Sequence, residues 1–199
     1  NSMFGGMPAY LISTLYVSDF LAHGGKVFQG LLPIPAGALF LYMLGFFILM
    51  LVLRVNPWLS LLGAIAFAFS SYNFIIFEAG HNSKAIAIGY MAPALAGIIL
   101  LYRGKYLLGG ALTALFLALE VKATHPQITY YLLLLIAVYV IFIFFESLKE
   151  KQLKRFFTAS AIFAVAGIFA VLTHFTALMA INEWGEVSIR GKSELSIAQ

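Results

Sequence analysis

Long apolar runs separated by short polar turns dominate the chain from residue 36 onward. A helix that crosses a bilayer needs about 20 mostly apolar residues, within a range of about 17–25. Six runs are candidates for such helices: Ala36–Val55, Trp58–Phe77, Ala85–Tyr102, Tyr106–Leu119, Ile128–Phe145 and Phe156–Ile181. The links Arg54–Pro57 and Arg103–Lys105 are so short that the helices they join must be antiparallel neighbours. The pattern predicts an all-α protein, a polytopic transmembrane helical bundle of about six spans.

Residues 1–35 mix apolar and polar positions at near-helical spacing, in two stretches that Gly24 and Gly25 separate. This pattern predicts short amphipathic helices that lie in the membrane interface, within the first outer loop. We therefore divide the chain into an extracytoplasmic loop (1–35), a six-helix bundle (36–181) and an extracytoplasmic segment (182–199). Because the chain opens inside a loop, we expect it to be a piece of a longer protein.

The composition supports a membrane protein and excludes a soluble globule. Hydrophobic residues make up 62% of the chain and charged residues 10%, whereas a typical soluble domain is about 45–50% apolar and about 25% charged. The chain has no cysteine. Disulfides, thiolate metal sites and a cysteine nucleophile are therefore excluded.

The charges divide unevenly between the two sides that six spans create. One side, which we call the basic side, consists of residues 54–57, 103–105 and 146–155. The other, which we call the polar side, consists of residues 1–35, 78–84, 120–127 and 182–199. The basic side carries most of the lysines and arginines: Arg54, Arg103, Lys105, Lys149, Lys151, Lys154 and Arg155. The positive-inside rule makes the basic side cytoplasmic, so both ends of the chain are predicted to be extracytoplasmic.

The partners follow from the same charges. The basic run that ends at Arg155 is expected to meet anionic lipid head groups. It is short and no recognition motif accompanies it, so we expect no nucleic-acid partner.

The polar side holds most of the residues with reactive side chains, and the densest group is Glu78–Lys84. Asn82 or Ser83 would cap a helix that starts at Lys84, where the free backbone N–H groups and the lysine could hold a phosphate. His81 could bind the same anion or move a proton. Glu78 could act as a base. The alternative is a solvated, capped turn with a Glu78–Lys84 salt bridge.

A second polar group follows the fourth apolar run. That run is short, so Glu120 is expected near the membrane interface. Thr124–Gln127 fits a capping box, which needs no functional explanation. Glu120, Lys122 and His125 are not explained by the cap and could form a second wall of the same pocket as Glu78–Lys84. The alternative is an interfacial ion pair between Glu120 and Lys122.

His174 lies within the last apolar run, where a lone histidine more often hydrogen-bonds between helices than binds a ligand. Asp19 and Glu78 are the candidate ligands for a divalent metal ion shared with a substrate phosphate. No P-loop, Rossmann fingerprint or HExxH motif is present, which argues against nucleotide hydrolysis and metalloprotease chemistry.

Four stretches resemble the bacterial YfhO-like family of large polytopic membrane proteins: Asn1–Tyr10, Phe67–Tyr72, Glu78–Ala85 and Ser188–Leu195. The chain looks like an N-terminal portion of such a protein. The family is similar to GT-C glycosyltransferases, which take a sugar from a polyprenyl-phosphate carrier and use an acidic residue in the first outer loop. The resemblance implies a cell-envelope enzyme of the bacterial inner (cytoplasmic) membrane, with Asp19 as a stand-in for that acidic residue.

The leading hypothesis is therefore an extracytoplasmic glycosyltransferase that uses a polyprenyl-phosphate sugar. The catalytic candidates are Asp19, Glu78 and His81, and the phosphate-binding candidates are Asn82, Ser83, Lys84, Lys122 and His125. Two alternatives belong to other classes. One is a transporter or flippase for a lipid-linked anion. The other is a structural assembly subunit that docks a protein partner through its outer loops.

Overall fold

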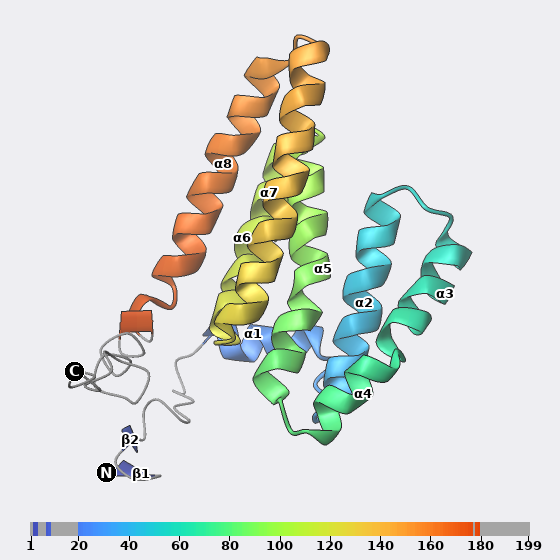
Figure 1. Cartoon of the computed structure of the whole chain (residues 1–199), viewed down its shortest axis with the longest axis vertical. Helices are drawn as coiled ribbons and strands as arrows, with labels where there is room; N and C mark the ends of the chain where they lie inside the picture. Colours follow the sequence, from blue (N-terminus) through green and yellow to red (C-terminus); the bar gives the residue numbers. More distant parts are fainter. Residues whose placement is uncertain (1, 4–6, 9–19, 177, 180–199) are drawn as a thin grey trace, which may run out of the picture.

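The computed structural model describes residues 2–3, 7–8, 20–176 and 178–179, and this part of the chain is almost entirely helical (Figure 1). Two short strands, β1 (Ser2–Met3) and β2 (Met7–Pro8), pair antiparallel. The helices are α1 (Phe20–Phe28), α2 (Ala36–Val52), α3 (Pro57–Ala68), α4 (Ser71–Glu78), α5 (Asn82–Tyr102), α6 (Tyr106–Lys122), α7 (Pro126–Lys149) and α8 (Leu153–Leu172). The predicted all-α fold class is confirmed.

Helices α2, α3 and α5–α8 alternate in direction and form an elongated bundle (Figure 1). The α2–α3, α5–α6 and α7–α8 turns lie at the upper end in this view, and they make up the basic side. The α4–α5 and α6–α7 turns lie at the other end, on the polar side. Helix α1 crosses that end, where the Tyr90 hydroxyl donates to the Gly25 carbonyl at 3.1 Å and accepts from the Gln29 amide at 3.4 Å.

Four helical segments are long and apolar enough to cross a membrane: Pro57–Glu78, Asn82–Tyr102, Pro126–Lys149 and Leu153–Leu172. They indicate a multi-pass membrane protein. Helices α2 and α6 have 17 residues each, at the lower end of the length that spans a bilayer. That these two also cross the membrane, for a total of about six spans, stays a prediction.

Helix α5 is the centre of the bundle. In its apolar window 78% of the residues are buried inside the protein, against 17% in α7. The outer helices expose large apolar side chains such as Leu133 and Ile168, which indicates contact with lipid. Glycines let the neighbours of α5 approach closely. A Cβ on Gly109 of α6 would lie only 2.4 Å from the backbone nitrogen of Leu101 in α5.

The second predicted span is broken into α3 and α4. The backbone leaves helical geometry at Phe69 and Ser70. The buried Asn73 amide of α4 donates to the carbonyls of Phe67 and Ala68 at 2.8 and 3.2 Å. These carbonyls belong to the end of α3 and have no partner in their own helix. The Ser70 N–H also donates to the Phe67 carbonyl at 3.3 Å, so the asparagine side chain adds to the hydrogen bonds at this helix end.

Two boundaries predicted from the apolar pattern are wrong. The last span was expected to continue to Ile181, but α8 ends at Leu172, and the turn that follows contains His174. Apolar residues lie on both sides of this turn, so the apolar pattern alone does not mark the end of the helix. Gly24 and Gly25 were expected to separate two stretches, yet both lie inside α1. Gly25 is needed there because a Cβ would lie 2.9 Å from the Tyr90 hydroxyl.

The close approach of α5 and α6 predicts that Gly109→Ala is destabilising. The added methyl group meets the backbone of Leu101, which cannot rotate away, so the helices must separate. Overpacking of this kind costs about 1–3 kcal/mol. Unfolding in mixed micelles of detergent and SDS measures the change. Gly167→Ala is the matched control, because no atom lies within 4 Å of that position in α8. Equal stability of Gly109→Ala and the unmodified chain would contradict the tight packing.

The predicted orientation can be tested by cysteine labelling, because the chain has no native cysteine. Ser83→Cys places a thiol on the polar side and Lys154→Cys places one on the basic side, both at exposed positions. In right-side-out vesicles we expect an impermeant maleimide to label Ser83→Cys directly. Lys154→Cys should react only after the membrane is permeabilised. The opposite pattern would reverse the assignment of the two sides.

Candidate functional site

The first turn of the candidate site joins α4 to α5 on the polar side. Helix α4 ends at Glu78, and Gly80 takes a left-handed conformation with φ +70°. His81 is the N-cap residue of α5 and makes no capping hydrogen bond with its side chain. The helix therefore begins at Asn82 and not at Lys84, so the predicted caps at Asn82 and Ser83 are wrong. The chain reverses tightly at Gly80 and is helical again from Asn82, so Asn82 and Ser83 lie inside the helix and not at its cap.

The second turn joins α6 to α7. Thr124 has a φ of +54°, and His125 is the N-cap residue of α7 without a side-chain capping bond. The predicted capping box is therefore wrong, because Thr124 occupies the left-handed turn position that precedes the cap. Gln127 instead donates to the Tyr131 hydroxyl at 2.8 Å. Pro126 occupies the first position of the helix, which suits its missing N–H.

The two turns meet on the polar side. The half-buried His125 lies close enough to Lys84 and His81 for their positive charges to act on its imidazole. Burial is the main cause that lowers the pKa of His125, and the charges of Lys84 and His81 lower this pKa further. A hydrogen bond to its own backbone opposes the shift. The imidazole is therefore neutral at pH 7. That Glu78–Lys84 and the second turn form one site stays a prediction.

A buried carboxyl group lies at the base of the second turn. Glu120, in the last turn of α6, has 0% of its surface exposed. The Thr129 hydroxyl of α7 donates to Glu120 Oε1 at 3.0 Å and also lies 3.4 Å from the carbonyl oxygen of His125. Among the described residues, Glu120 Oε2 has no hydrogen-bond partner. Buried polar atoms are nearly always paired, so this oxygen is an open acceptor beside the turn.

Neither of the ion pairs required by the alternative explanations is present among the described residues. The ammonium of Lys84 lies 5.3 Å from the centroid of the Tyr72 ring, a cation–π geometry, and forms no salt bridge with Glu78. Glu120 uses one oxygen for Thr129 and does not pair with Lys122. These charged side chains therefore cannot be explained as mutual salt bridges.

The predicted site residues divide into three sets. Glu78, His81, Asn82, Ser83 and Lys84 lie together at the end of α4 and the start of α5. Lys122 ends α6 and His125 precedes α7, on the second turn. Asp19 lies outside the described residues. Within the part of the chain that is described, no group of three or more His, Asp or Glu side chains could hold a metal ion, so Glu78 lacks companion ligands there.

The sequence pattern did not indicate Thr129, and it placed Glu120 only as one member of the second wall of the pocket. The positions of these two residues in the sequence could have indicated that they meet. Both flank a short link between two antiparallel helices, in the last turn of one and the first turn of the next. Residues placed in this way face each other, which is the relation that the hydrogen bond between them shows.

Comparisons of the chain with protein-family models, with curated proteins and with solved structures find no match. The resemblance to the YfhO-like family therefore stays a prediction.

The meeting of the two turns predicts the titration of His125. Lys84→Gln removes a positive charge that disfavours the imidazolium, so the pKa of His125 should rise. It should stay below 6.5 because burial, the larger cause, persists. Nuclear magnetic resonance of histidine-labelled protein in micelles, with His125→Gln for assignment, measures this pKa. Lys105→Gln, at the opposite end of the bundle, should leave it unchanged. No rise in Lys84→Gln would show that the turns do not converge.

Proposed function

We propose that this chain is part of a GT-C-type membrane glycosyltransferase that takes a sugar from a polyprenyl-phosphate carrier at the extracytoplasmic face. The observation that supports the proposal is that two polar turns lie at the same end of an apolar bundle, with the charge of Lys84 felt at His125 and the buried Glu120 at the base of the second turn. Such a donor has an apolar tail that lies in the bilayer and a charged group at its surface. A polar site at a membrane-facing helix end matches both parts.

The start of α5 is suited to the donor phosphate. The backbone N–H groups of the first helical turn, including those of Ser83 and Lys84, have no acceptor within the helix. The positive end of the helix dipole and the Lys84 ammonium add attraction for an anion. His125 is neutral at pH 7 because its pKa is lowered, so it contributes hydrogen bonds and no charge. The exposed apolar side chains of α7, such as Leu133 and Leu134, offer a surface for the polyprenyl tail.

The reaction would then assign separate roles to the acidic side chains. The acceptor hydroxyl oxygen forms a bond to the anomeric carbon of the sugar, and the bond from that carbon to the phosphate oxygen breaks. The electron pair leaves on the phosphate, which Lys84 neutralises. The hydroxyl proton passes to a carboxylate, for which the exposed Glu78 is the described candidate, alongside Asp19.

The distribution of charge argues against the flippase alternative. Transporters usually hold polar groups near the middle of the membrane. Helix α5 carries no charged residue between Lys84 and Arg103, and α7 carries none between its start and Glu146. The charged groups of these helices lie at their ends, which favours chemistry at a face over passage through the bundle.

The proposal predicts that Lys84→Ala weakens donor binding. Loss of a charge-assisted hydrogen bond costs about 1.5–3 kcal/mol, which is roughly tenfold or more in affinity. Native mass spectrometry of the chain in nanodiscs, titrated with a polyprenyl-phosphate sugar, measures the change. Lys105→Ala removes the same charge from the basic side and should bind as the unmodified chain does.

Two results would contradict the proposal. The first is equal affinity in Lys84→Ala and Lys105→Ala, which would remove the phosphate from this turn. The second is no binding by the unmodified chain. In that case a structural subunit that docks a partner through its outer loops becomes the leading explanation.

A further inference from the structure

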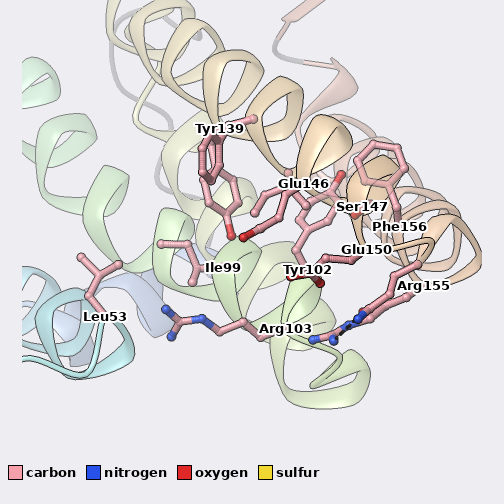
Figure 2. A pocket seen from close by; sticks show the side chains of 13 residues that line it. Leu53, Ile99, Tyr102, Arg103, Tyr139, Glu146, Ser147, Glu150, Arg155 and Phe156 are labelled. Atoms are coloured by element: carbon pink, nitrogen blue, oxygen red, sulfur yellow. Dashed lines mark hydrogen bonds between the residues drawn. The ribbon is translucent and has the colours of Figure 1, made fainter.

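A second polar site lies on the basic side, at the opposite end of the bundle from the two turns. A pocket of about 340 Å³ opens there between α5, α7 and α8 (Figure 2). Its charged and polar side chains come from Arg103, Glu146, Ser147, Glu150, Gln152 and Arg155. Ligand pockets are typically about 300–1,000 Å³, so this pocket has room for a small polar group and not for a whole lipid.

The pocket contains equal numbers of positively and negatively charged side chains, but these side chains form no salt bridge with one another. Arg103 and Arg155 are matched in number by Glu146 and Glu150, which lie one helical turn apart on α7. Figure 2 shows the arginines along the lower part of the view and the glutamates above them. The structure records no salt bridge between these side chains, although all four line one pocket. Separated charges of both signs are complementary to a ligand that itself carries both signs.

Both arginines are held in place by the protein. Arg103 donates a hydrogen bond from Nη1 to the carbonyl of Val52 at the end of α2. Arg155 donates from Nη1 to Gln152 Oε1 at 3.3 Å. Its guanidinium lies against Gly104, where a Cβ would be 3.4 Å from Nε. Each guanidinium has five N–H donors, so most of them remain for a ligand.

The rim of the pocket is apolar and open to lipid. Phe142 of α7 is 63% exposed and Leu53, at the end of α2, is 44% exposed. Both lie at the basic end of the apolar bundle, the depth at which lipid head groups meet hydrocarbon. The deeper wall contains Tyr102, whose hydroxyl is within 3.0 Å of Ser160 Oγ and so already has a partner. A ligand therefore finds charged groups inside the pocket and an apolar path out of it.

We propose that this pocket binds the head group of a zwitterionic phospholipid that carries a phosphate and a primary ammonium. The phosphate lies between Arg103 and Arg155, and the ammonium lies on Glu146 and Glu150. The acyl chains leave over Leu53 and Phe142. A purely anionic lipid fits less well, because the two glutamates would face it without a cation. This site is independent of the proposed transferase, since it shares no residue with the polar side.

Native mass spectrometry of the detergent-purified chain, titrated with individual lipids, tests the proposal. We expect phosphatidylethanolamine to bind more tightly than phosphatidylglycerol. Arg155→Gln should weaken phosphatidylethanolamine binding about tenfold. Lys154→Gln removes the same charge from the neighbouring residue, which does not line the pocket, and should change binding less than twofold. The double variant Glu146→Gln, Glu150→Gln should reverse the preference and favour phosphatidylglycerol.

Three outcomes would overturn the proposal. Equal effects of Arg155→Gln and Lys154→Gln would reduce the site to general surface charge. A preference of the unmodified chain for phosphatidylglycerol would make it an anion site. Soluble phosphoethanolamine binding as tightly as the lipid would identify a free metabolite as the ligand instead. Unfolding of each variant in mixed micelles confirms that lost binding is not lost folding, and Arg155→Gln leaves the Arg103–Val52 bond intact.

Discussion

The bundle depends on how closely its central helix approaches its neighbours. Helices inside a bilayer gain little from the hydrophobic effect when they associate, because lipid tails are as apolar as their side chains. Dispersion contacts between closely packed helices must therefore stabilise the bundle in place of the hydrophobic effect. On α5, a Cβ at Gly97 would lie 2.7 Å from the backbone nitrogen of Thr113 in α6, and one at Gly89 would lie 2.5 Å from the Leu41 side chain of α2. Small residues on α5 therefore let two neighbours pack against it at once.

This packing couples the two ends of the molecule to one rigid element. Helix α5 begins with Lys84 in its first turn and ends next to Arg103. The first of these residues belongs to the proposed phosphate site and the second to the lipid pocket. Because α5 is held on several sides, the positions of both residues are set by the core and not by the turns alone. The two ends of the molecule carry different charged residues. These include the residues that lie at the two ends of the buried helix α5.

The apolar pattern was sufficient to predict the helices and their alternation, because it reports directly on which residues avoid water. It predicted some helix ends, such as Ala36, Tyr102 and Tyr106, and missed others. Phe69 and Ser70 interrupt an apolar run, and the asparagine that satisfies the broken end lies several residues further on. Capping residues were also misjudged, since Gly80 and Thr124 take left-handed conformations that leave histidines at both N-cap positions.

The candidate site was predicted only in part. Its residue types were evident from their one-sided distribution, but their meeting depends on tertiary packing. The pocket on the basic side, to which Glu146 and Glu150 contribute, was not predicted. Nothing in their spacing indicated that the guanidinium groups of two other helices would share a cavity with them.

Glu120 differs from the other buried polar residues in how its side chain is hydrogen-bonded. Four polar or charged residues are buried in the described part of the chain: Ser60, Asn73, Thr113 and Glu120. Ser60 and Asn73 donate to backbone carbonyls, and Thr113 packs against Gly97 where two helices come closest. Glu120 only accepts one hydrogen bond from Thr129. A glutamine would accept the same bond without burying an ionisable group. The hydrogen bond from Thr129 therefore does not by itself require a carboxyl group at this position.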